Sequence, residues 1–151
     1  LMYLNPGAIK GDDEYLSEVL KIGDTTSSAT QIKVLEKFGL KATFHQNGTL
    51  SKLRGLISVG IPVPIGILHK GPSYAPQGGG HWICVIGYNE DPKFPGGGTF
   101  IVHDPYGDLD NYSGTYPTTN GNALQYSFQM ISQRWTCEGP GSGWYIDLSD
   151  N

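Results

Sequence analysis

Two short apolar runs, joined by a segment of turn-forming residues, constrain this chain more than any other feature. The first run spans residues 79–88 and places His81 directly after two glycines. The second spans residues 100–107 and places Asp104 directly before a proline. Residues 89–98 between them carry prolines and glycines, which end strands and form turns. The pattern predicts a β-hairpin.

The spacing of this hairpin predicts that His81 and Asp104 meet. Their midpoint, (81 + 104)/2 = 92.5, falls inside the connecting segment, so without a bulge their Cβ atoms would lie opposite each other, about 5 Å apart. An imidazole oriented by a carboxylate is the base half of a nucleophilic triad. Each residue alone also fits a structural role, a strand-end histidine and a turn-starting aspartate. Together they favour a functional site, and Gly79 and Gly80 would let a substrate strand approach the backbone.

The alternation of side chains along the first run indicates which cysteine could partner His81. One face should hold His81, Ile83, Val85 and Gly87, and the other Trp82, Cys84, Ile86 and Tyr88. Cys84 is therefore interpreted as a small buried residue and not as a nucleophile. The position of Cys137 relative to His81 does not follow from the sequence. A Cys84–Cys137 disulfide and two separate thiols both stay open.

A zinc site is an alternative use of the same region. Its candidate ligands are His69, His81, His103 and Asp104. Strand alternation turns His103 away from Asp104, however, and no His-x-x-x-His or Glu-x-x-His spacing supports a metal. We predict neither a metal nor another cofactor.

The size and charge of the chain narrow the class of protein. A length of 151 residues predicts a single domain over residues 1–151. A net charge of −4 argues against nucleic acid and anionic membranes as partners. No apolar run approaches the roughly 20 residues of a membrane span. Few charges and many turns suit an extracellular or virion-borne protein at least as well as a cytosolic one.

The periodicity of the remaining sequence predicts an α+β fold. Helices are expected over residues 12–22, 28–38, 50–59 and 123–134, with Ser28 and Thr49 as caps of the second and third. Strands are expected over residues 41–45, 61–68 and 144–148, and residues 108–122 read as a polar loop. Helices come first and antiparallel strands later, which is typical of α+β proteins.

Residues 80–88 and 100–107 together resemble the papain-fold cysteine peptidases of the bacteriocin leader-processing type and their relatives. In that family a histidine starts one strand and an Asp-Pro ends the next. Residues 24–44, 47–50 and 60–66 look similar too, so the resemblance covers most of the chain from residue 1 to about 107. Residues 126–128, 134–135 and 138–144 resemble the end of such domains in bacteriophage virion and lysis proteins.

The resemblance implies a papain-like fold, with N-terminal helices packed on an antiparallel sheet. It implies that His81 and Asp104 are the second and third members of a catalytic triad, and that Gly79, Gly80 and Trp82 border the substrate cleft. The implied substrate is a peptide, specifically the peptide part of bacterial peptidoglycan. The implied location is virion-associated or extracellular, facing the cell wall, with other virion proteins as possible partners.

The resemblance leaves the nucleophile open. The family's cysteine, and the glutamine before it, would align ahead of residue 1, because residues 1–4 look like the end of the helix that carries them. Either both residues lie upstream, or this copy has lost its nucleophile and is a non-catalytic virion structural or wall-binding module. The family's Asn-Asp-Pro is His103-Asp104-Pro105 here, which keeps the acid.

Overall fold

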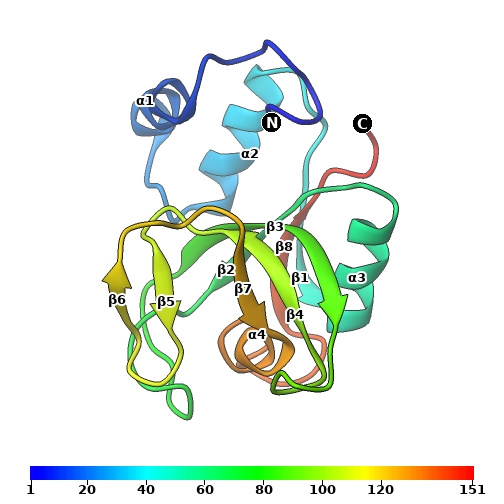
Figure 1. Ribbon diagram of the computed structural model, residues 1–151. Coiled ribbons are helices and arrows are strands. Elements are labelled where there is room, and N and C mark those ends of the chain that lie inside the picture. Colours follow the sequence, from blue (N-terminus) through cyan, green and yellow to red (C-terminus); the bar gives the residue numbers. More distant parts are fainter. The chain divides into compact units, whose positions relative to one another are not determined.

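A computed structural model describes residues 1–151 as a mixture of helices and antiparallel strands, as the sequence predicts (Figure 1). In chain order the elements are α1 (Asp12–Ile22), α2 (Ser28–Lys37), β1 (Thr43–Gly48), α3 (Leu50–Ser58), β2 (Val63–Ile67), β3 (His81–Glu90), β4 (Gly98–His103), β5 (Asp108–Asp110), β6 (Thr115–Thr118), β7 (Leu124–Ser127), α4 (Phe128–Arg134) and β8 (Gly143–Asp147). None of the helices is long and apolar enough to cross a membrane. The chain divides into two compact units, one of Leu1–Phe44 with Ile146–Asn151 and the other of His45–Tyr145.

The first unit contains α1 and α2. Acidic residues fill the first turn of α1 and Lys21 lies in its last, so both ends suit the helix dipole. The hydroxyl of Ser27 accepts a hydrogen bond from the backbone N–H of Thr30, so the cap of α2 is Ser27 and not the predicted Ser28. The Tyr15 hydroxyl donates to Gln31 Oε1 at 2.6 Å and ties the two helices together.

The second unit is built on the main sheet, whose strand order is β1-β8-β2-β3-β4-β7. Strand β3 lies between β2 and β4, and all the pairings described around it are antiparallel. Helix α3 begins after Thr49, whose hydroxyl accepts from the backbone N–H of Lys52, as predicted. One apolar core joins the sheet to α3 and α4, and its buried residues include Leu53, Leu56, Val63, Ile65, Ile67, Ile83, Val85, Phe100, Val102, Phe128, Met130 and Ile131.

Residues 108–134 depart from the sequence prediction. The predicted loop over residues 108–122 contains β5 and β6, which form a separate two-stranded sheet. The helix predicted from residue 123 begins only at Phe128, capped by the Ser127 hydroxyl, which accepts from the backbone N–H of Met130. The residues before it form β7, because pairing with β4 places Tyr126 opposite Phe100 and buries it.

Strands β3 and β4 form the predicted hairpin, but its register was predicted wrongly. Glu90 pairs with Gly98, so the hairpin centres at (90 + 98)/2 = 94. A bulge between Val85 and Gly87 then moves the pairing back by one residue, so that Val85 pairs with Val102 and the register ends two residues from the predicted one. The register therefore puts Asp104 beside Ile83 and not opposite His81. The bulge also reverses the alternation beyond Ile86, so Tyr88 packs against the core and does not share the face of Trp82 as predicted.

Candidate functional site

The His81 and Asp104 side chains meet despite the shifted register. Nε2 of His81 lies 2.7 Å from Oδ1 of Asp104, and the two side chains are 8 % and 0 % exposed. His81 is the first residue of β3, and Asp104 follows the last residue of β4 on the same face. Residues one step apart diagonally on a face remain within reach of long side chains. This hydrogen bond is the only one to the His81 ring, so Nδ1 is the nitrogen that remains for a proton from elsewhere.

The Asp104 carboxylate has a donor for each of its lone-pair sites. Oδ1 accepts from His81 and from the backbone N–H of Tyr106 at 3.0 Å. Oδ2 accepts from the hydroxyls of Tyr116, at 2.9 Å, and Tyr126, at 2.7 Å. Burial by itself raises the pKa of Asp104, but the hydrogen bonds from His81 and Tyr126 outweigh it, so the pKa is lowered. Asp104 is therefore a buried carboxylate ion at neutral pH.

The backbone of Asp104 is held by a close chain crossing. Its N–H donates to the Gly121 carbonyl at 2.9 Å, and its own carbonyl accepts from the N–H of Gly107 at 3.1 Å. A Cβ at residue 121 would lie 1.7 Å from the Asp104 carbonyl oxygen. Only glycine fits at residue 121, because the two backbones approach more closely than any side chain permits.

Three further aromatic rings surround His81. The ring of Tyr106 stacks on the imidazole, with centroids 4.6 Å apart and planes 13° from parallel. His69, beyond the end of β2, lies 4.5 Å from His81, and Tyr116 lies at 6.3 Å on edge. Tyr106 is more than half exposed, so it shields one face of a buried imidazole from solvent.

His69 is buried, and its Nδ1 has no hydrogen-bond partner. Burial, followed by the neighbouring His81, lowers the pKa of His69 to about 4. The ring beside His81 is therefore neutral at physiological pH.

A buried arginine organises the loops around these rings. Arg134, at the end of α4, donates to the carbonyls of Leu68, Lys70, Gly71 and Asn111 and to Oδ1 of Asn111, at 2.8–3.3 Å. It is 1 % exposed and has no carboxylate partner. Its five donors all serve to join the segment after β2 to the segment after β5.

The predicted substrate contacts lie at different places. Gly79 is exposed, and Gly80 adopts a φ of +98°, which disfavours any other residue there. The Trp82 side chain packs over Gly66, its partner in β2, on the face of β3 opposite to His81. Contact of these three residues with a substrate stays a prediction.

Both cysteines are free thiols, and neither makes a hydrogen bond to His81. Cys84 lies on the face of β3 opposite to His81, and burial raises its pKa to about 11. Cys137 is exposed beyond α4, and partial burial also raises its pKa. Neither thiol is activated as a nucleophile where it stands.

The four candidate zinc ligands predicted from the sequence do not all lie together. His69, His81 and Asp104 are neighbours, but the exposed His103 uses Nδ1 to accept from the backbone N–H of Ala123. No group of three or more His, Cys, Asp or Glu side chains is placed to hold a metal ion.

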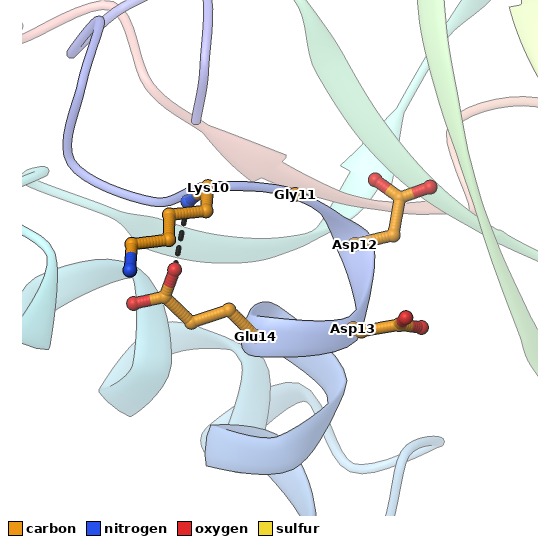
Figure 2. A pocket seen from close by; sticks show the side chains of 5 residues that line it. All are labelled: Lys10, Gly11, Asp12, Asp13 and Glu14. Carbon is orange, nitrogen blue, oxygen red and sulfur yellow. Dashed lines mark hydrogen bonds between the residues drawn. The ribbon is translucent and has the colours of Figure 1, made fainter.

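One surface hollow belongs to the other unit and contains none of these side chains. It lies at the start of α1 and is lined by residues 10–14 (Figure 2). There the backbone N–H of Lys10 donates to Oε2 of Glu14 at 2.7 Å, as at many helix starts. The hollow is open to solvent, and the His81–Asp104 pair lies outside it.

Sequence reasoning missed four residues of the site: Tyr106, Tyr116, Tyr126 and Arg134. Tyr106 lies two residues after Asp104, in the turn predicted at residues 104–107, and this position was the one signal in the sequence for its role. The others come from β6, β7 and α4, and their approach to Asp104 and the loops depends on sheet pairing that the sequence does not display.

Comparison with known proteins gives one match. The sequence model of a family described as the Peptidase_C39 like family matches residues 9–136. No curated protein sequence and no solved structure gives a significant match.

Proposed function

This chain belongs to the Peptidase_C39 like family and is a cysteine peptidase-like domain, and from that premise we propose that it hydrolyses peptide bonds in bacterial peptidoglycan. The observation that carries the proposal is the buried hydrogen bond between His81 Nε2 and Asp104 Oδ1. The resemblance of the C-terminal residues to phage virion and lysis proteins supports a virion-associated setting that faces the cell wall. We also propose a papain-like fold, on the grounds of the family match and the family resemblance.

In the proposed reaction, Nδ1 of His81 takes the proton of a cysteine thiol, and the resulting thiolate attacks the peptide carbonyl carbon. The imidazolium then returns its proton to the leaving amine, and water hydrolyses the thioester with His81 again as base. Asp104 accepts from Nε2–H throughout, so it orients the ring and stabilises its positive form. The pair is buried, which strengthens this interaction.

The nucleophile is the part of the proposal that Cys84 and Cys137 do not supply. We propose that the nucleophile is a cysteine that follows a glutamine, as the family resemblance implies, and that the glutamine stabilises the oxyanion. Reading the coding sequence upstream of Leu1 tests this directly. A Gln followed within a few residues by a Cys supports the peptidase, and the absence of both overturns it.

The second candidate is a non-catalytic virion structural or wall-binding module. It is favoured by one observation, namely that neither cysteine of the chain stands beside His81. Such a module would bind purified peptidoglycan in a sedimentation assay without releasing new amino groups from it.

The decisive measurement is the release of amino groups from purified peptidoglycan by the natural full-length protein. His81→Ala should lower the rate on the order of 10²- to 10⁴-fold, because it removes the general acid and base. His45→Ala is the matched control, since His45 stacks on Tyr145 and makes no contact with Asp104. Equal rates for wild type and His81→Ala would remove His81 from the mechanism.

The substrate class needs a separate arm of the same assay. A soluble leader peptide is offered beside peptidoglycan. Cleavage of the soluble peptide alone would keep the peptidase activity and overturn the cell-wall assignment.

A further inference from the structure

Two phenol hydroxyls from different strands converge on one oxygen of Asp104. Tyr116 lies in β6 of the small sheet, and Tyr126 lies in β7 at the edge of the main sheet. Both hydroxyls end on Oδ2, the oxygen that His81 does not use. Oδ2 therefore accepts hydrogen bonds from two tyrosines, and Oδ1 accepts them from His81 and the backbone N–H of Tyr106.

The direction of these hydrogen bonds follows from the chemistry of the groups. A carboxylate ion only accepts, and each phenol has one proton to give. Burial, and then the neighbouring Asp104, raises the pKa of both phenols, so both keep that proton. The Tyr126 oxygen also accepts from the backbone N–H of Leu109 at 3.0 Å, and its proton goes to Asp104 at 2.7 Å, closer than the Gly107 carbonyl at 3.2 Å.

The same arrangement determines which nitrogen of His81 carries its proton. With Oδ2 occupied by two donors, the carboxylate cannot turn without breaking hydrogen bonds, and its side chain is fully buried. Oδ1 therefore stays aimed at Nε2. Because Oδ1 can only accept, a neutral His81 must hold its proton on Nε2, and Nδ1 is left as the basic nitrogen.

We propose that Tyr116 and Tyr126 are positioning residues that fix the Nε2–H tautomer of His81 by holding the Asp104 carboxylate in one rotation. The other titratable groups around the pair are His69, beyond β2, and Tyr106, in the turn after β4, with Arg134 of α4 farther away. None of them donates to Oδ2. The consequence for hydrolysis rests on the proposed function, whereas the tautomer does not.

The test is ¹⁵N NMR of the histidine side chains in the chain as it stands, recorded over a range of alkaline pH values until the His81 signals no longer change. The two ring nitrogens give distinct shifts and couplings for each tautomer. Wild type should show His81 as Nε2–H alone. Tyr126→Phe should introduce a detectable share of Nδ1–H, and Tyr116→Phe with Tyr126→Phe a larger one.

Tyr88→Phe is the matched control. Tyr88 is a partly buried tyrosine against the same core, and its hydroxyl contacts only Ser58. It should leave the His81 signals unchanged. A double variant with the pure Nε2–H pattern of wild type would overturn the positioning role. If the double variant does not fold, Tyr126→Phe decides, because an unchanged tautomer in that folded variant would overturn the role equally.

The activity of the full-length protein gives a second, independent reading. Tyr126→Phe should lower kcat about tenfold with KM unchanged, because it disturbs the base and not substrate binding. A changed tautomer in Tyr126→Phe, together with a hydrolysis rate that is the same in His81→Ala as in wild type, would keep the positioning role and overturn the peptidase. Hydrolysis that is lost in His81→Ala but unchanged in Tyr126→Phe would keep the peptidase and overturn the positioning role.

Discussion

Single residues decide how much charge the site holds. Asp104 is an ion, His69 is neutral, and the two phenols keep their protons. The neutrality of His69 matters most, because a second positive imidazole 4.5 Å from His81 would oppose the charging of His81. Burial thus keeps the ring next to His81 uncharged.

The low pKa of His69 predicts a stability that falls in acid. The pKa is about 4 in the folded chain and near its ordinary value of 6.5 when unfolded, so unfolding takes up a proton between these pH values. The His69 contribution is fully present above about pH 6.5 and is lost as the pH falls toward 4. At pH 4.5 the loss should be about 2 kcal/mol.

Urea unfolding of wild type and His69→Phe at pH 7 and pH 4.5 measures this loss. The phenyl ring keeps the aromatic packing but cannot take up a proton. The variant should therefore lose less of its free energy of unfolding between the two pH values. An identical loss in both proteins would show that His69 does not titrate on unfolding.

Gly121 predicts a second effect at the residue scale. Gly121→Ala would drive a methyl group into the Asp104 carbonyl, so the backbone of Asp104 must move, at a cost of about 1–3 kcal/mol in unfolding free energy. Gly79→Ala is the control, because a Cβ there has no heavy atom within 4 Å. A Gly121→Ala variant as stable as wild type would contradict the close crossing. In the full-length protein, Gly79→Ala also tests the predicted substrate contact, through a change in KM.

At the scale of elements, the sequence predicts what local periodicity encodes. The bounds of α1 and the Thr49 cap agree with the structure because acidic first turns and capping hydroxyls act within a few residues. The bulge at Ile86 cannot be recognised in the sequence, because Ile86 is an ordinary strand residue and nothing about its type marks it as unpaired. Strand β7 was mistaken for the start of a helix because Tyr126 owes its extended conformation to β4, more than twenty residues away.

In the site, too, local sequence patterns predict some residues, and others depend on pairing between distant strands. His81 and Asp104 could be predicted because both sit on the same face of one hairpin, a relation that survives a shift of two residues in register. Tyr116 and Tyr126 could not, because their hydroxyls reach Asp104 only after β6 and β7 find their partners.

The Arg134 contacts predict that α4 stabilises the loops beside the site. Arg134→Met would leave several buried carbonyl groups without donors, and we expect a loss of about 3 kcal/mol or more in unfolding free energy. Arg54→Met is the control, since Arg54 only lies over the Phe128 ring and should contribute at most about 1 kcal/mol. Equal losses measured by urea denaturation would show that the carbonyl contacts add no stability.

At the scale of the whole molecule, α1 and the central strands of the main sheet differ in how many apolar residues they bury. Helix α1 has one buried residue, Val19, whereas β3 and β4 both lie between other strands and against the continuous core. Local opening is easier where fewer apolar groups are exposed by it.

Native-state hydrogen exchange should therefore rank the elements. We expect the slowest amides in β3 and β4, around Val85 and Val102, and faster exchange in α1. The measurement is exchange followed by NMR on the intact chain without denaturant. Amides of α1 that exchange as slowly as those of β3 would contradict this ranking.

The anchoring of the loops by Arg134 has a consequence for how such a domain diversifies. Apart from Asn111, the groups it holds are carbonyl oxygens, which are the same whatever side chain the residue carries. Tyr74 and Tyr112, on the two anchored loops, are 84 % and 82 % exposed. Single substitutions can therefore change the exposed side chains of these loops while the hydrogen bonds of Arg134 to their backbone persist.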